Sequence, residues 1–219
     1  MNDLGLINIF AQDICFLSEH HKKIWAAFNV SPEGKVCKEL LMSQVNAEPA
    51  RTFAPEFLLF KVTEILDTEF KAKFGKNLFE YHIFQDNINL KIQRFCVLNL
   101  EDLFKLAQLI TKYVIERINI DNIDSILTKD YSGLGSIKKI EKLLSQFSID
   151  GYNLTSVLVG VYELRLAESH LSSSDLDDSI KIAGLNMNQP FPLIGKQLIF
   201  NVANCLKEIF IQLEGIKKS

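Results

Sequence analysis

The sequence has few cysteines, and they lie far apart. Four occur in 219 residues, and no two stand in a C-x-x-C pair. Structural zinc sites and disulfide frameworks use more closely organised cysteines, so neither is expected, and we expect no metal and no cofactor. Apolar neighbours surround each cysteine in the sequence, which predicts small buried hydrophobic side chains at Cys15, Cys37, Cys96 and Cys205.

A surplus of positive charge is also absent. The chain has 24 Lys and Arg against 27 Asp and Glu, for a formal net charge of −3, and neither half of the chain is basic. Proteins that hold long nucleic acids electrostatically usually have a basic surplus. Any contact with nucleic acid is therefore expected to be local.

Long apolar runs are missing as well. No run approaches the roughly 20 residues that a transmembrane helix needs, so no membrane span is expected. The N-terminal stretch lacks a basic segment, and Gln12 and Asp13 interrupt its apolar run, which does not fit a secretory signal. We therefore expect a cytoplasmic protein.

The residues that are present are those of a folded protein. Hydrophobic residues make up 47% of the chain and charged residues 23%, and 16 Phe is a high number for this length. This composition argues against disorder, and the chain is long enough to bury a core without disulfides or metals.

Apolar residues repeat at helical spacing along most of the chain. Together with capping residues, Gly and Pro at the ends of the repeats, this pattern predicts helices over residues 4–28, 36–45, 55–75, 77–97, 99–117, 123–127, 136–147, 151–171, 175–183 and 193–213. The stretch 77–97 also alternates like a strand. A helix is favoured there because no second alternating segment offers a partner, and a lone strand leaves its backbone groups unpaired.

The expected fold class is all-α. We expect an N-terminal helical part packed on a C-terminal up-down four-helix bundle with a short accessory helix. The two expected domains are residues 1–96, an N-terminal helical region, and residues 97–219, the bundle. No linker rich in Pro, Gly or Ser separates them, so a shared interface is expected.

The helix expected over 151–171 carries the polar residues that most suggest chemistry, although its apolar stripe also predicts a core helix. It ends in Arg165-Leu-Ala-Glu-Ser-His170, an R-x4-H motif. Such a motif near the end of a compact helical bundle resembles the HEPN superfamily, the helical nucleotide-binding and ribonuclease domains common in bacterial toxins and defence systems. The resemblance covers residues 97–219.

The resemblance implies a metal-independent endoribonuclease that acts as a homodimer, with Arg165 and His170 as catalytic residues. Attack by a 2′-hydroxyl needs a proton acceptor and a group that neutralises charge on the phosphate, which suit a histidine and an arginine. On one straight helix, positions five apart diverge by roughly 140° and 7.5 Å. Convergence on one phosphate therefore requires side-chain reach, a helix end or a second subunit.

A non-catalytic interpretation stays open beside the catalytic one. Arg165 and Glu168 are spaced for an ion pair on a solvated face, and His170 is placed to interact with the helix C-terminus. In this interpretation the protein is a non-catalytic, all-helical interaction or regulatory module, and its N-terminal helices bind a protein partner. In the catalytic interpretation the partner is RNA or a nucleotide.

Two further segments suggest ligand contacts. The stretch 133–139 offers backbone N–H groups, Ser136 and two lysines at a helix start, but it lacks a preceding strand and is better explained as a glycine turn with a serine cap. The run 20–23, His-His-Lys-Lys, is the densest basic patch and suits a nucleic acid or an acidic partner. The alternative is the exposed face of a helix whose Ile24 and Phe28 are buried.

Overall fold

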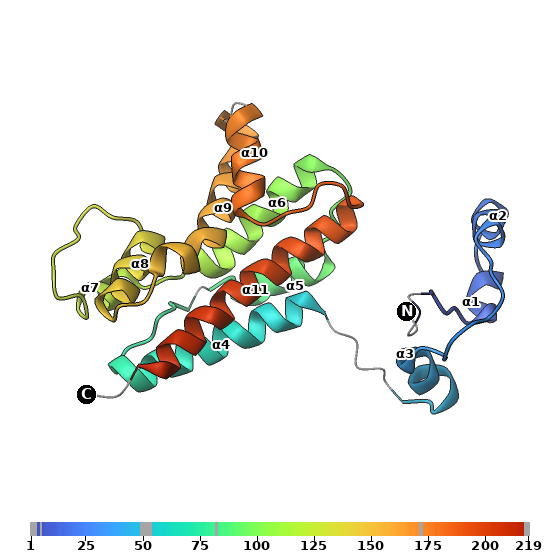
Figure 1. Cartoon of the computed structure of the whole chain (residues 1–219), viewed down its shortest axis with the longest axis horizontal. Helices are drawn as coiled ribbons and strands as arrows, with labels where there is room; N and C mark the ends of the chain where they lie inside the picture. Colours follow the sequence, from blue (N-terminus) through green and yellow to red (C-terminus); the bar gives the residue numbers. More distant parts are fainter. Residues whose placement is uncertain (1–3, 5, 49–53, 82, 171–172, 217–219) are drawn as a thin grey trace. The chain divides into compact units, whose positions relative to one another are not determined.

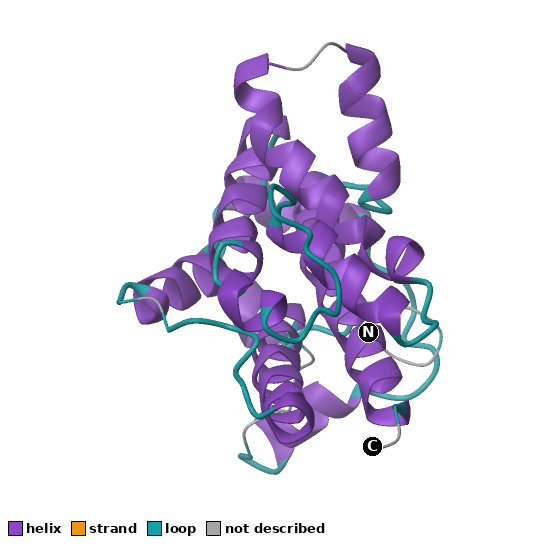
Figure 2. Cartoon of the chain, turned by 90° about the vertical axis from the view of Figure 1, so that its left-hand side faces the viewer, coloured by secondary structure: helices purple, strands orange, loops and turns teal. Residues whose placement is uncertain are grey.

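The computed structural model describes residues 4, 6–48, 54–81, 83–170 and 173–216, without the side chains of 167–170 and 173–174. The chain forms two compact units, Met1–Phe53 and Ala54–Ser219. The described residues are mostly helical and contain no strand, as Figure 2 shows, and a single isolated antiparallel bridge joins Phe79 and Ile118. The all-α class is therefore confirmed.

The first unit contains short helices. These are α1 (Ala11–Cys15), α2 (Glu19–Ala27), α3 (Lys38–Leu40) and the π-helix η1 (Leu41–Val45). The single helix expected over 4–28 is wrong. Ser18 has an extended backbone and its Oγ accepts the N–H of His21, so it caps the start of α2 and separates that helix from α1.

The second unit holds the longer helices. They are α4 (Pro55–Phe74), α5 (Gln85–Arg94), α6 (Leu100–Ile110), the π-helix η2 (Thr111–Ile115), α7 (Ile120–Asp124), α8 (Ser136–Gln146), α9 (Gly151–His170), α10 (Ser173–Ile182) and α11 (Phe191–Gly215). Local signals set several of their ends. Pro55 is the first residue of α4, Gly75 ends it with φ 72°, and Asn99 caps α6 by accepting the N–H of Asp102 at 2.9 Å.

Helix α5 covers only part of the helix expected over 77–97. Before it, Asp67 Oδ1 accepts the N–H of Leu78 at 2.7 Å, and Leu78 O accepts the N–H of Asn119 at 2.8 Å. These backbone groups are satisfied without a helical turn. The stretch before α5 is therefore not helical, because the segment after η2 offers it backbone hydrogen bonds. The spacing of apolar residues did not reveal that segment.

Helices α4 and α11 run side by side in the same direction (Figure 1). Near their starts Glu56 pairs with Lys196, and near their ends Lys73 Nζ donates to the backbone oxygens of Leu213 and Glu214, the latter at 3.1 Å. Residues 54–96 therefore belong to the same unit as the C-terminal helices. The structural division follows Phe53, not residue 96.

Helix α9 is a core helix of the second unit. It packs against α6, α8, α10 and α11, and its Leu158, Val161 and Leu164 are fully buried. All members of the main hydrophobic cluster lie between Leu59 and Leu213. None of the helices in the described ranges combines the length and apolar character needed to cross a membrane.

The four cysteines differ in burial. Cys37 and Cys205 are buried, whereas Cys15 and Cys96 are exposed, so the expected burial is wrong for the latter two. Cys15 lies on α1, a helix without a buried residue, and Cys96 lies in the connection between α5 and α6.

Candidate functional site

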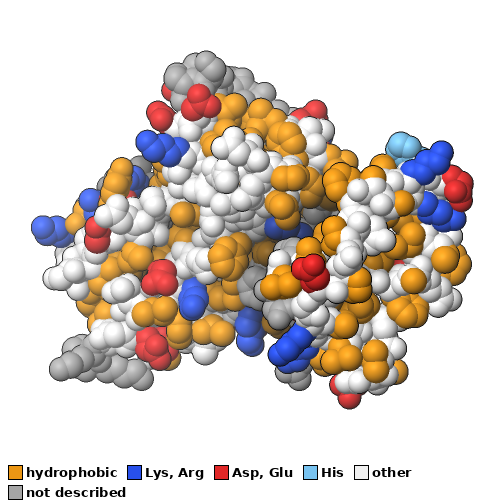
Figure 3. All heavy atoms as spheres, turned by 45° about the vertical axis from the view of Figure 1, so that its right-hand side comes forward, with side chains coloured by type: hydrophobic (Ala, Val, Ile, Leu, Met, Phe, Trp, Pro, Cys, Tyr) orange, Lys and Arg blue, Asp and Glu red, His pale blue; other side chains and the backbone are white. Residues whose placement is uncertain are grey.

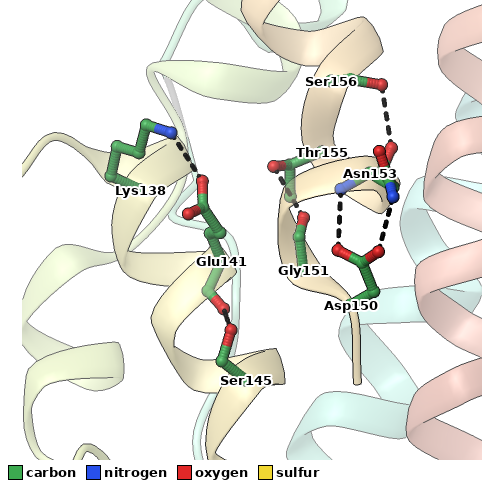
Figure 4. A network of polar contacts seen from close by, with 8 residues as sticks. All are labelled: Lys138, Glu141, Ser145, Asp150, Gly151, Asn153, Thr155 and Ser156. Carbon is green, nitrogen blue, oxygen red and sulfur yellow. Dashed lines mark hydrogen bonds and ion pairs between the residues drawn. The ribbon is translucent and has the colours of Figure 1, made fainter. Parts of the chain in front are cut away.

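The start of α9 is fixed by polar contacts and by the missing side chain of Gly151. Asp150 Oδ1 accepts the N–H of Asn153 at 3.2 Å, and Thr155 Oγ1 donates to Gly151 O at 2.9 Å (Figure 4). A Cβ at Gly151 would lie 2.5 Å from the backbone oxygen of Glu141 on α8. The two helix backbones are thus in direct contact, and α9 begins from a defined position.

The middle of α9 is fixed in the same way against α10. A Cβ at Gly160 would lie 2.5 Å from the backbone nitrogen of Ala183, just after α10. Because α8 and the end of α10 each meet α9 at a glycine, the helix that carries the R-x4-H motif is held at two points along its length.

Arg165 lies near the C-terminal end of α9 and contacts two side chains. Its Nη1 forms an ion pair with Glu116 Oε1, which follows η2, and its guanidinium lies 4.7 Å from the centre of the Tyr162 ring. The Arg165 side chain is 26% exposed. The guanidinium is therefore oriented before any ligand binds and remains accessible to solvent.

Glu116 and Tyr162 were missed as partners of Arg165. Tyr162 is three residues away on the same helix, a spacing that offered a signal. Glu116 is 49 positions away in sequence, and only the packing of α9 on η2 brings the two together. The side chain of Glu168, the partner expected in the non-catalytic interpretation, is outside the described residues.

His170 is the last residue of α9. Its backbone is helical, and its side chain lies outside the described residues. The structure thus places the two motif residues on one continuous helix, and their convergence on one phosphate stays a prediction.

Both lysines at the start of α8 form ion pairs with carboxylates. Lys138 Nζ pairs with Glu141 at 2.7 Å, and the buried Lys139 pairs with Asp124 at 2.5 Å. The residue that caps α8 is Gly135, not Ser136, whose Oγ instead donates to Ile115 O at 3.4 Å. Since both lysines already have carboxylate partners, the interpretation as a structural turn is favoured over a phosphate site.

The basic run in the first unit lies on α2. Lys22 pairs with Glu19 at 2.9 Å, and His21 Nδ1 lies 2.8 Å from Ser18 Oγ. Ile24 and Phe28 are exposed, so their expected burial is wrong. Helix α2 has no buried residue, and its run resembles an ordinary solvated helix face.

An open cavity between α5 and α6–η2 is a basic feature of the second unit that its residue spacing alone did not reveal. Its volume is about 570 Å³, and cationic side chains from both helices line it: Lys91, Arg94, Lys105 and Lys112. In the sequence, the cations of each helix already stand at helical spacing. Only the packing of α5 on α6 and η2 brings the two basic helix faces together.

Metal ligation finds little support in the described part of the chain, where no three His, Cys, Asp or Glu side chains gather in a suitable arrangement. Comparison with protein-family models, curated proteins and solved structures finds no match to this chain. The functional argument therefore rests on the residues and their geometry.

Proposed function

We propose that the second unit is a HEPN-like domain that binds RNA and cleaves it without a metal, through Arg165 and His170, in a bacterial toxin or defence context. The observation that carries the proposal is the state of Arg165. Its guanidinium is oriented by Glu116 and Tyr162 at the end of a rigidly packed helix, and it faces solvent.

The chemistry follows from the two side-chain types. A guanidinium has five N–H donors, and the contact with Glu116 engages Nη1, so a phosphate can be bound beside the carboxylate or in its place. His170 accepts the proton of the attacking 2′-hydroxyl, and Arg165 neutralises the charge that develops on the phosphate. The 2′-oxygen forms a bond to phosphorus while the bond from phosphorus to the 5′-oxygen breaks. The products are a 2′,3′-cyclic phosphate and a 5′-hydroxyl that takes its proton from water.

We infer that the two roles are divided between two copies of the chain. Within one helix the two side chains leave the axis roughly 140° apart. In a homodimer whose two-fold axis passes near the ends of α9, Arg165 of one copy meets His170 of the other. Each dimer then contains two equivalent sites.

The contact with Glu116 also supports a second function, a non-catalytic helical interaction module. In that case the ion pair is a structural link between α9 and the segment after η2. Exposed ion pairs of this kind contribute only about 0–1 kcal/mol to the free energy of unfolding. The pair then has little effect on stability and no effect on RNA binding or cleavage.

Local rather than extended contact with RNA fits the surface. On the face drawn in Figure 3, Lys and Arg side chains are mostly separated from one another by hydrophobic and acidic ones. Short single-stranded RNA is therefore the substrate to test.

The test is cleavage of end-labelled single-stranded RNA in EDTA by the purified chain and its variants. Wild type should cleave, and His170→Ala should lower the rate about 100-fold or more, with a comparable loss for Arg165→Ala. Glu116→Gln, which removes the carboxylate that orients the guanidinium, should lower the rate less than Arg165→Ala does. Lys207→Gln, a change at an exposed lysine on α11, is the control for net charge.

Two results would reject the catalytic proposal. One is cleavage that survives both substitutions unchanged, which would point to another nuclease in the sample. The other is no cleavage by wild type, with Arg165→Ala and Glu116→Gln each changing the free energy of unfolding by no more than about 1 kcal/mol, which is the result that the interaction module predicts.

A further inference from the structure

We propose that the cavity between α5 and α6–η2 is a binding site for nucleotide phosphates, in which cations from both helices hold the phosphates and apolar side chains that line the cavity contact the base or ribose. None of the residues that line the cavity belongs to α9. The proposal goes beyond RNA cleavage and holds whether or not Arg165 and His170 are catalytic.

The two walls of the cavity are single helix faces with the same spacing. Residues at i, i+3, i+4 and i+7 lie on one side of a helix. On α5, such a series starts at residue 87 and continues with Leu90, Lys91 and Arg94. On α6–η2, a second series starts at Lys105, continues through residues 108 and 109, and ends at Lys112. Each wall thus presents two cations and one leucine to the same space.

The charge of the cavity is not cancelled locally. Among the described residues, no carboxylate lies within 4.0 Å of the side-chain nitrogens of Lys91, Arg94 or Lys112. Lys105 differs, because it pairs with Glu101 at 2.5 Å. Three cations without a carboxylate partner around one cavity produce a local positive potential that attracts an anion with several charges.

The apolar side chains that line the cavity favour a nucleotide over inorganic phosphate. Leu90 is 51% exposed, and Phe95 and Leu109 are partly buried at the same cavity. Apolar and aromatic surface beside cations suits a ligand with a flat apolar body and a charged end. A volume of about 570 Å³ lies in the range of small-molecule sites.

The backbone of the second wall supports a ligand role. Lys112 lies in the π-helix η2, which contains Thr111–Ile115. A π-turn interrupts the α-helical hydrogen-bond pattern, and such turns occur frequently at functional sites.

The test is calorimetric titration of the full chain in EDTA with ATP, inorganic tripolyphosphate and adenosine. ATP should bind more tightly than tripolyphosphate, and adenosine should bind weakest, because it lacks the charges. The cavity variant Lys91→Gln/Arg94→Gln should weaken ATP binding roughly tenfold for each cation removed, and Lys112→Gln should weaken it about tenfold.

The matched control is Lys71→Gln/Lys207→Gln, which removes two positive charges from exposed positions on α4 and α11 outside the cavity. It should change the dissociation constant for ATP less than twofold.

A single-stranded RNA of ten nucleotides distinguishes a free nucleotide from a polynucleotide as the source of the phosphates. Loss of ATP or RNA binding in the cavity variants but not in the control variant supports the site. The proposal is overturned if neither ligand binds wild type at millimolar concentration, if the control variant loses binding equally, or if a hexaglutamate peptide binds as tightly as ATP.

Discussion

The side chain of Arg165 is bound to a partner from a distant part of the sequence, and this contact determines its state before a ligand arrives. Glu116 orients the guanidinium, and the Tyr162 ring supports one of its faces. An arginine fixed in this way loses less side-chain entropy when it binds a phosphate than a freely rotating one. Under the proposed function, Glu116→Gln should therefore weaken RNA binding.

Burial strongly changes the pKa of Cys205. Burial raises the pKa of its thiol to about 12 from an ordinary value of 9.0, and its Sγ donates to Leu154 O at 3.0 Å. Above pH 9 the thiol therefore ionises in the unfolded chain but not in the folded one. Between about pH 9 and 12 the free energy of unfolding should fall by about 1.4 kcal/mol per pH unit from this group.

This prediction is checked by urea denaturation at pH 7.5, 9.5 and 10.5 for wild type and Cys205→Ala. The variant is less stable at pH 7.5 because a cavity replaces the thiol, but it should lose less stability with rising pH than wild type. If the free energy of unfolding falls equally with pH in the two proteins, the thiol does not ionise differently in the folded and unfolded chains.

Helix α9 depends on glycine at the points where other elements touch it. A Cβ at Gly160 would lie 2.5 Å from Ala183 N and 2.9 Å from Ala183 Cα, and backbone atoms cannot rotate away as a side chain can. Gly160→Ala should therefore lower the free energy of unfolding by about 1–3 kcal/mol, despite the better helix propensity of alanine.

The control for this substitution is Gly215→Ala at the end of α11, where no described atom lies within 4 Å of the added Cβ. It should be neutral or stabilise by up to about 1 kcal/mol. Thermal unfolding of the two variants makes the comparison. Equal melting temperatures for both would remove the argument that α9 and α10 meet at Gly160.

Helix α5 is packed less well than the helices around it. Two of its side-chain oxygens, Gln85 Oε1 and Asn89 Oδ1, are buried without a hydrogen-bond partner among the described atoms, and each such group costs about 1–3 kcal/mol. Its backbone amides should exchange with deuterium faster than those of α4 and α11. Hydrogen-exchange mass spectrometry checks this, and equal protection of α5 and α11 would contradict it.

Much of the helical pattern was predictable because its signals are local. Pro55 and Gly75 bound α4, and Asn99 caps α6, through contacts within a few residues. The parallel pairing of α4 with α11, the ion pair of Arg165 with Glu116 and the cavity beside α5 all join residues far apart in sequence. Spacing contains no information about such contacts, which is why the boundary at residue 96 and the break in the stretch 77–97 were misjudged.

At the scale of the whole molecule, the hydrophobic core belongs to the second unit. Its main cluster begins at Leu59 and ends at Leu213, whereas Phe16 and Phe28 in the first unit are 82% and 78% exposed. Helix α4 supplies a large part of the surface on which α11 packs. The second unit therefore contains what it needs to fold.

A fragment of residues 54–219 should unfold cooperatively, with a melting temperature within a few degrees of that of the full chain. A fragment of residues 97–219, which lacks α4 and α5, should fail to unfold cooperatively because α11 loses its apolar partner. Circular dichroism during heating distinguishes the two. Cooperative unfolding of the shorter fragment would restore the boundary at residue 96.

The central claim is that Arg165 and His170 cleave RNA together across two copies of the chain. Its most direct measurement is RNA cleavage by an equimolar mixture of Arg165→Ala and His170→Ala after subunit exchange. Half of the dimers are then mixed, and one of their two sites has both native residues, so about a quarter of wild-type activity should return. A mixture as inactive as each variant alone would contradict a site shared between two copies.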